Sequence, residues 1–221
     1  MKTLMYCGLG LVMAVVAAQK GADVSSEGKA VALPAPVLEG KMSLEQAIGH
    51  RRSARRFTEQ ALTVKEIGQL CWSGQGITDP KRGLRTSPSA GALYPIELYV
   101  VTAEGVDRYL PARHELQQHL AGDQRKALQE AASGQPSVGA APACIVIAGD
   151  IERSARKYRD RAERYCWLEA GHVAQNILLQ ATALNLAGVP VGGYDDTKTV
   201  EAIKLPKGWR VLYLLPLGHP Q

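Results

Sequence analysis

Four arginines and one serine lie within seven residues of this sequence, in the stretch Arg51-Arg52-Ser53-Ala54-Arg55-Arg56-Phe57. A guanidinium group forms paired, charge-assisted hydrogen bonds with phosphate oxygens, and a serine hydroxyl adds a neutral donor. This stretch, called the arginine motif below, therefore indicates a site for a phosphate group. The same residues are also typical of a solvated basic turn, so the motif needs support from elsewhere in the chain.

Two loops consist of small and rigid residues that would let a flat ligand approach the backbone. The first, called the proline turn, is Thr86–Pro95 with the sequence T-S-P-S-A-G-A-L-Y-P. The second, called the glycine turn, is Gly188–Asp195, in which adjacent Gly192 and Gly193 can present backbone N–H groups. A serine hydrolase built on Ser89 is disfavoured, because G-x-S-x-G would need glycine two residues earlier, where the sequence has serine.

The arginine motif lies between two segments that carry helix-start signals. Ser43 with Gln46, and Thr63 with Glu66, have the spacing of capping boxes, in which each side chain bonds the backbone N–H of the other residue. Two short helices are therefore expected on either side of the motif. A further, polar helix is predicted over 123–132.

Apolar patterning predicts the other elements. Buried strands are expected over 96–102, 143–149 and 209–217, which are apolar runs with strand-forming residues. The longest helix is predicted over 153–186, because its second half repeats apolar residues at spacings of three and four. We expect this helix to form the central core or an interface. Helices and strands alternate irregularly, which favours the α+β class.

The composition is typical of an ordinary soluble globular protein, with 221 residues, 46% hydrophobic and 21% charged. A chain of this size can bury about 70% of its unfolded surface, so it can form a core without disulfides or metals. Disorder, collagen and coiled coil are disfavoured. The net charge of +5 is too mild to indicate nucleic-acid binding by itself.

The five histidines and four cysteines show no metal-ligand spacing, so no metal site is expected. Cys71 and Cys144 lie in apolar sequence and are predicted to be buried small hydrophobic residues. A single disulfide among the cysteines stays open at this point.

The first residues are typical of an export signal. Met1 and Lys2 precede an apolar run from Leu4 to Ala18, which predicts a signal peptide over 1–18. A membrane-spanning helix needs about 20 apolar residues, so no stable span is expected, although an uncleaved leader could anchor the protein. An extended tether is predicted over 19–40 and the folded domain over 41–221. The expected location is periplasmic or secreted.

Five motifs in this order resemble the FMN-dependent nitroreductases, and within them the azoline-dehydrogenase-like branch of the SagB/ThcOx type. They are R-R-S-x-R-x-F in the arginine motif, R-T-x-P-S-A-G-A-L-Y-P at the proline turn, E-A-G-H-x-A-Q-N-I-L-L-Q from Glu169, V-G-G-Y-D in the glycine turn, and the closing P-L-G-H-P. The resemblance covers the chain from about Ser43 onward. It implies a mixed sheet flanked by helices, and a homodimer with the long helix at its interface and FMN in a groove between the subunits. No G-x-G-x-x-G motif opens a strand–helix unit, which disfavours a Rossmann dehydrogenase.

The resemblance also assigns FMN-binding roles by motif position. Arg51 and Ser53 would hold the phosphate and ribityl end with help from Arg52, and Arg55 would lie near the pyrimidine edge. A fixed cation there would stabilise the negative charge of reduced flavin. The residues expected to line the isoalloxazine are Pro88, Ser89, Ala90 and Gly91, from the partner subunit, and Gly192 and Gly193, through N–H groups near N5.

One feature departs from the family pattern. Many members continue past the G-H-P step to basic residues that also hold the phosphate, whereas this sequence ends at Pro220-Gln221. We expect either that Arg85 or Arg56 substitutes for them, or that FMN binds more weakly.

The pair Lys157-Tyr158 resembles a pair that the azoline branch associates with proton abstraction as hydride leaves for FMN. A lysine surrounded by other cations, here Arg156 and Arg159, gives up its proton more readily and can then act as a base. The alternative is a solvated helix face, since the segment 153–164 is dense in charge.

The main hypothesis is an exported FMN-dependent oxidoreductase that transfers hydride through flavin N5. The donor would be NAD(P)H or an azoline-like small molecule, and the acceptor would be electron-poor. The alternative is a non-catalytic exported flavin-binding protein. A nucleic-acid-binding domain is disfavoured, because an export signal argues against it.

Overall fold

A seven-stranded sheet forms the middle layer of the protein, in the computed structural model that describes residues 29–221. The sheet order is β1-β6-β5-β4-β7-β9-β8, and β2 pairs with β3 in a separate hairpin. The strands are β1 (Ala30–Ala32), β2 (Ile77–Asp79), β3 (Leu84–Arg85), β4 (Ile96–Val101), β5 (Gly105–Leu110), β6 (Glu115–Ala121), β7 (Ala143–Gly149), β8 (Ala187–Gly188) and β9 (Arg210–Gly218).

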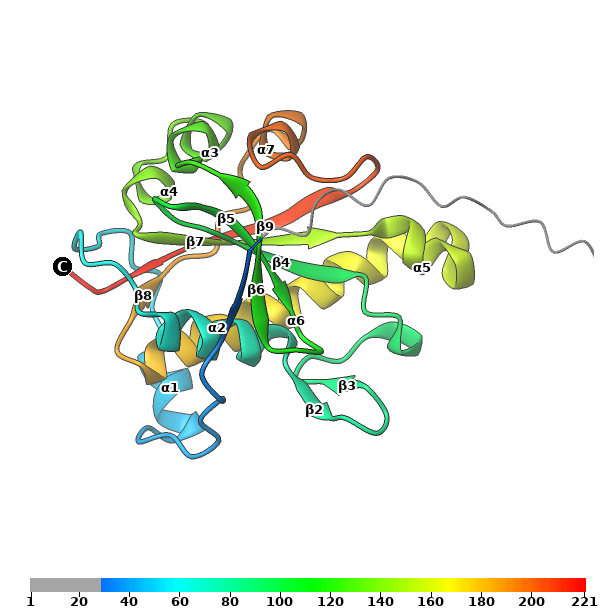
Figure 1. Cartoon of the computed structure of the whole chain (residues 1–221), viewed down its shortest axis with the longest axis horizontal. Coiled ribbons are helices and arrows are strands. Elements are labelled where there is room, and N and C mark those ends of the chain that lie inside the picture. Colours follow the sequence, from blue (N-terminus) through cyan, green and yellow to red (C-terminus); the bar gives the residue numbers. More distant parts are fainter. Residues whose placement is uncertain (1–28) are drawn as a thin grey trace, which may run out of the picture.

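Helices cover both faces of this sheet (Figure 1). The helices are α1 (Leu44–His50), α2 (Val64–Gln75), α3 (Arg125–Ala131), α4 (Pro136–Ala140), α5 (Ile151–Tyr158), α6 (Ala162–Ala183) and α7 (Asp196–Ala202). Helices α1, α2 and α6 lie on one side, and α3, α4 and α7 lie on the other. The paired strands are antiparallel, and a parallel bridge from Ser53 to Gly188 extends the β8 edge. The predicted α+β class, with a mixed sheet flanked by helices, is confirmed.

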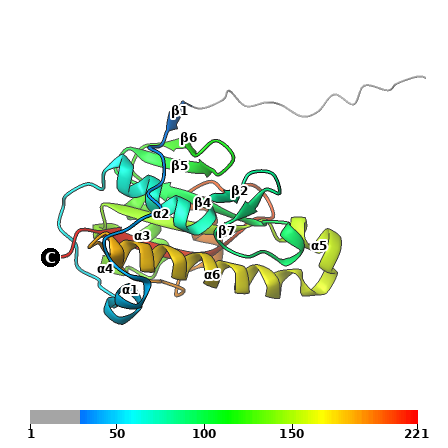
Figure 2. The same cartoon turned by 90° about the horizontal axis from the view of Figure 1, so that it is seen from below.

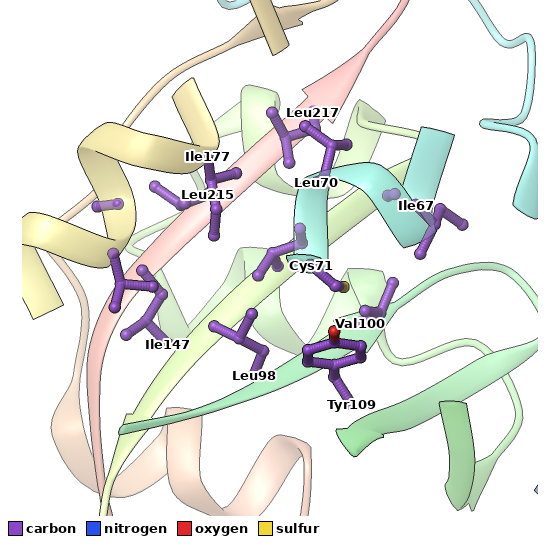
Figure 3. Packing of buried hydrophobic residues seen from close by; sticks show 14 of the residues in the cluster. Ile67, Leu70, Cys71, Leu98, Val100, Tyr109, Ile147, Ile177, Leu215 and Leu217 are labelled. Carbon is purple, nitrogen blue, oxygen red and sulfur yellow. The ribbon is translucent and has the colours of Figure 1, made fainter. Parts of the chain in front are cut away.

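The alternation of side chains along the strands builds a core on each face. In β7, Ile145 and Ile147 point toward α2 and α6, whereas Cys144 and Val146 point toward α3 and α4. Figure 3 shows the first of these cores, in which Ile177 of α6 lies near residues of β9 and α2. Because β7 is buried on both faces, it reads as a continuous apolar run, and its predicted bounds 143–149 agree with the structure.

The two capping boxes are confirmed. At the start of α1, the Ser43 hydroxyl accepts from the Gln46 N–H at 3.2 Å and the Gln46 side chain accepts from the Ser43 N–H at 3.0 Å. Thr63 and Glu66 form the same reciprocal pair at the start of α2. α1 ends at His50 and the second box starts α2 after Thr63, so the segment 51–62, which contains the arginine motif, connects these two helices.

The prediction of one continuous helix over 153–186 is wrong. The chain forms α5, a 3₁₀ turn over Arg159–Arg161, and then α6. The break is at Arg159, whose φ of 51° and ψ of −123° are strained for a residue other than glycine. No glycine or proline marks it. Ahead of the break, Arg153 of α5 is held by Glu97 of β4 at 2.7 Å and by Asp150, the N-cap of α5, at 3.2 Å.

Part of the segment expected to be a tether packs on the domain. β1 pairs with β6 at the edge of the sheet, the Leu33 side chain is buried, and the Val37 N–H donates to Gln69 Oε1 at 2.8 Å. No apolar period marks this segment, because β1 has only three residues and all of them are exposed. The hairpin of β5 and β6 was also not predicted, since its exposed positions are polar and charged.

The predicted signal peptide, 1–18, and the first part of the predicted tether lie outside the described residues. Within 29–221, none of the helices combines the length and the apolar character that crossing a bilayer requires.

Candidate functional site

The arginine motif lies against the beginning of the glycine turn. Ser53 forms a parallel bridge with Gly188, and the Ala54 N–H donates to the Gly188 carbonyl at 3.0 Å. Phe57, at the end of the motif, is buried and bridges Pro220 near the C-terminus. Two stretches far apart in the sequence are therefore joined at the β8 edge of the sheet.

The side chains of the arginine motif differ in what they contact. Arg51 is half-buried, Ser53 and Arg55 are exposed, and neither arginine forms an ion pair with any residue of 29–221. Arg52 differs, because its guanidinium donates to the carbonyls of Gly49 at 2.9 Å and of Arg51 at 2.8 Å. It therefore caps the last turn of α1, and its predicted role as an assistant at the phosphate competes with this structural contact.

Gly192 and Gly193 leave backbone donors open. Both are exposed, and neither N–H donates a hydrogen bond to another group within residues 29–221. The Gly193 carbonyl accepts from Gln135 Nε2 at 2.7 Å, which fixes the peptide from the other side of the turn. The unpaired guanidiniums and the serine hydroxyl form a donor set for an anionic ligand, and the two free N–H groups lie further along the turn that begins at Gly188. The residues present therefore fit a phosphate-bearing cofactor.

The proline turn has a strained backbone. Gly91 has φ of 62°, and the neighbouring Ala92 and Tyr94 have φ of 53° and 47°. Such conformations persist only when the surroundings hold them. Here the Ser89 hydroxyl accepts from the Tyr94 N–H at 2.9 Å, and Arg153 Nη1 donates to the Tyr94 carbonyl at 2.7 Å.

Helix α6 provides two further anchors for this turn. Glu169 Oε1 accepts from the Ala90 N–H at 2.9 Å, and Asn176 Nδ2 donates to Ser87 Oγ at 3.1 Å. Burial raises the pKa of the Glu169 carboxyl, while the hydrogen bonds from Ala90 and Ser89 lower it in part. Glu169 and Asn176 are seven residues apart, so they lie on the same face of the helix and hold the turn at two points.

Lys157 and Tyr158 converge on Gly91. A Cβ atom at Gly91 would lie 2.7 Å from Lys157 Nζ and 2.7 Å from Tyr158 Oη, so the two polar atoms are within twice that distance of each other. The Tyr158 ring packs edge-on against Tyr165, with ring centroids 4.9 Å apart. The predicted pair therefore lies directly over the proline turn, in space that the missing glycine side chain leaves free.

The two groups of predicted site residues lie at opposite ends of α6. The arginine motif lies at the end where α1 and β8 are found, and Lys157 and Tyr158 lie at the end where α5 is found (Figures 1 and 2). α6 has 22 residues and so spans about 33 Å. One subunit does not bring the arginine motif and the Lys157-Tyr158 pair together.

Of the two arginines expected to replace the C-terminal basic residues, one is already bound elsewhere. Arg85 donates to Gln75 Oε1 at 2.7 Å and lies over the Tyr94 ring, 4.5 Å from its centroid. It lines a small cavity of about 90 Å³ that contains no residue of the arginine motif. Burial lowers the pKa of this guanidinium. Arg56 is exposed and adjoins Arg55.

A cavity of about 760 Å³ lies along the second half of α6, and none of the predicted site residues lines it. Asn176 and Thr86 line it, so it adjoins the anchors of the proline turn.

Three cysteines in the described part of the chain are free and buried, and burial raises the pKa of Cys144 to about 12. Cys71 and Cys144 are thus the buried residues that the sequence predicted. Residues 29–221 hold no cluster of three metal-ligating side chains.

A model of the Nitroreductase family matches residues 48–219. The chain belongs to the nitroreductase family. This nitroreductase is an oxidoreductase enzyme. It is 38% identical over 198 residues to a Methanocaldococcus jannaschii protein that carries a nitroreductase name, a match that covers 87% of this chain and 98% of that protein.

Other relatives support the predicted branch. The chain is 28% identical over 156 residues to McbC of Escherichia coli, a microcin B17-processing protein and SagB-type relative, in a match that covers 65% of this chain and 57% of McbC. A solved nitroreductase-family structure from Ralstonia eutropha superposes with a TM-score of 0.81 at 27% identity, covering 90% and 92% of the two chains. The NADPH:FMN oxidoreductase of Vibrio harveyi shares the fold, with a TM-score of 0.61 at 24% identity over 80% and 69% of the chains.

Sequence reasoning did not assign a role to the residues that hold the proline turn in place. The sequence analysis includes Glu169 and Asn176 in a family motif and Arg153 in a charged segment, but it predicts no contact for any of them. A signal was present, because Glu169 precedes the apolar stripe of α6 and is buried beside it. A buried carboxylate in a helix needs a partner, which here is the Ala90 N–H.

Proposed function

We propose that this nitroreductase is an FMN-dependent enzyme that passes a hydride between a donor and an electron-poor acceptor. The donor would be NAD(P)H or an azoline-like small molecule. The observation that carries the proposal is the convergence of Lys157 Nζ and Tyr158 Oη on Gly91, in the turn expected to line the flavin. When bound, FMN would accept and return the hydride at N5.

The donor set at the β8 edge supports FMN as the cofactor. Arg51 and Ser53 would bind the phosphate end. The guanidiniums of Arg51 and Arg55 are free to bind a ligand, because neither forms an ion pair with an acid within residues 29–221. The free N–H groups of Gly192 and Gly193 would bind and orient the ring. Arg55 would hold a positive charge near the pyrimidine edge, where it stabilises the reduced form.

A homodimer would complete the site, because the two groups of residues lie at opposite ends of α6. The exposed face of α6 supports this arrangement. Trp167 and Leu168 are 41% and 57% exposed, and a Cβ at Gly171 would have no atom of residues 29–221 within 4 Å apart from its own helix backbone and chain neighbours. Glycine inside a helix costs about 1 kcal/mol relative to alanine, and no contact in this part of the chain requires it here. Close approach of a second α6 would explain both features.

Lys157 and Tyr158 would handle the proton when an azoline-like substrate is oxidised. That oxidation removes a hydride and a proton from neighbouring atoms, so a base must take the proton as the hydride leaves. Lys157 is exposed and its Nζ is beside Tyr158 Oη, which places an amine and a phenol at one spot. An NAD(P)H donor would need no such base, because it loses a hydride alone.

Export is a separate part of the proposal and rests on residues 1–18 alone. We propose that they form a signal peptide and that the mature enzyme acts in the periplasm or outside the cell. The mass of the protein recovered from an exporting host would be that of the chain without these residues. Recovery of the full-length chain in the membrane fraction would favour the anchored alternative instead.

The FMN proposal is tested by absorbance. Protein that lacks residues 1–18 is mixed with FMN at low micromolar concentration and then desalted. It should retain one flavin per subunit, with absorbance bands at about 370 and 450 nm. Arg51→Gln should weaken FMN binding by about tenfold, the worth of one charged hydrogen bond. Arg52→Gln should weaken FMN binding less, because that guanidinium already bonds the carbonyls of Gly49 and Arg51.

Two results would contradict this proposal. One is FMN that passes straight through the column. The other is an Arg51→Gln protein that binds FMN as tightly as the wild type. A protein that binds FMN but never passes electrons to a quinone, a nitroaromatic or oxygen would be the non-catalytic flavin-binding alternative.

A further inference from the structure

A group of exposed cations surrounds the end of α5 and the start of α6. Its members have no ion pair within residues 29–221 and are Arg156, Lys157, Arg159, Arg161 and Arg164, together called the basic tip. The acids in the same segment do not balance it. Glu163 is bound to Arg210 at 2.6 Å, and only Glu152 and Asp160 remain. Arg153 is not part of the basic tip, since Glu97 and Asp150 neutralise it.

The basic tip is not explained by helix stability. Cations at the C-terminal end of α5, such as Arg156, interact favourably with the helix dipole. Arg161 and Arg164 lie instead at the N-terminal end of α6, where the dipole disfavours positive charge. Arg159 lies just before Arg161 and Arg164, and its own backbone conformation is strained. Mutual repulsion between these charges adds a further cost, so the arrangement indicates a ligand of opposite charge.

The basic tip adjoins the position where the proposed reaction occurs. Lys157 belongs to the tip and also contacts the space over Gly91. Tyr158, its neighbour, packs on Tyr165, which lies next to Arg164 in α6. Figure 1 shows α5 at one end of the molecule, and the side chains of the basic tip are exposed there. A molecule that reaches Lys157 therefore passes through the field of four arginines.

We propose that the basic tip selects substrates that carry negative charge, such as carboxylates or phosphates of small size. This inference rests on the proposed function, because it assumes that hydride transfer occurs beside Lys157. Clustered charge of one sign raises the local concentration of oppositely charged substrate and its association rate by roughly 10- to 1,000-fold at low salt. Salt weakens this effect, because the Debye screening length is about 10 Å at 0.1 M ionic strength and shorter at higher salt.

The test compares two acceptors that differ in charge, 4-nitrobenzoate and 4-nitrobenzyl alcohol. FMN-loaded protein is photoreduced, and stopped flow gives the second-order rate constant for reoxidation by each acceptor. The ratio of the two constants, measured in each variant, cancels the intrinsic difference in reactivity. Arg156→Glu and Arg161→Glu should each lower the anion-to-neutral ratio by about tenfold at low salt. In the wild type, 0.5 M salt should lower it similarly.

Lys126→Glu is the matched control. Lys126 is exposed on α3, in the opposite helical layer, and the substitution changes the charge by the same amount. The ratio should stay within twofold of wild type in this variant. If both acceptors react but Arg156→Glu and Arg161→Glu change the ratio no more than Lys126→Glu, the basic tip has no role in selection and the proposed function stands. If neither acceptor reoxidises the loaded protein, both proposals are overturned.

Discussion

Lys157→Met should slow the reduction of bound flavin by a thiazoline substrate by about 10²- to 10⁴-fold. At 0.5 M salt, which screens the charge of the basic tip, it should slow the reduction by the anion NADH by less than about threefold. The difference arises because a thiazoline loses a proton as well as a hydride, whereas NADH loses only the hydride. Methionine keeps the length and the apolar stem of lysine but cannot accept a proton. Stopped-flow absorbance at about 450 nm, which falls as the flavin is reduced, measures both rates in one preparation.

The matched control for this substitution is Lys198→Met, which removes an exposed lysine from α7 on the other face of the sheet. It should leave both rates unchanged. FMN content, measured by absorbance, should be the same in all three proteins, because Lys157 is not among the residues assigned to the phosphate. Equal thiazoline rates in wild type and Lys157→Met would contradict the proton-transfer role. Lys157 would then be one of the cations on a solvated helix face.

The sequence predicted the parts of the fold that local rules determine. The capping boxes at Ser43 and Thr63 were read correctly, because an N-cap needs only residues three positions apart. The strand over 143–149 was also read correctly, since a strand buried on both faces is apolar throughout. These signals are contained within a few residues, and no distant contact is needed to interpret them.

The errors occur where distant contacts decide the structure. The break at Arg159 has no local marker, and the nearby contact of Arg153 in α5 with Glu97 in β4 joins residues 56 positions apart. β1 depends on pairing with β6, which lies more than 80 residues later. Neither contact can be inferred from propensity, because arginine favours helices and a three-residue edge strand shows no pattern.

The candidate site divides in the same way. Motif order identified the residue types and the family, but not which residues meet within one subunit. The structure brings Ser53 to Gly188 and Lys157 to Gly91, and it separates these two contacts by the length of α6. It also adds Glu169, whose carboxylate holds the Ala90 N–H and was outside the predicted site. A motif states which residues occur, whereas the packing of α6 decides which of them act together.

Gly91→Ala should lower the thiazoline-dependent rate by about 100-fold with only a modest loss of stability. The new methyl group would lie 2.7 Å from Lys157 Nζ and Tyr158 Oη, and both atoms end flexible side chains that can move away. Folding would therefore survive, but the two polar atoms would leave their positions, and a displacement of about 1 Å from productive geometry costs about 100-fold in rate. The left-handed backbone at φ of 62° adds a cost of about 1–2 kcal/mol for alanine.

Gly83→Ala separates these two effects. Gly83 has nearly the same backbone conformation, with φ of 66°, and a Cβ there would have no atom within 4 Å. Both variants should lose a similar free energy of unfolding in urea, since both place alanine in the left-handed region. Only Gly91→Ala should lose the thiazoline-dependent rate, because only at Gly91 does the methyl group meet Lys157 and Tyr158. If the two variants lose equal activity, backbone strain explains the loss and the contact over the proline turn is not needed for the reaction.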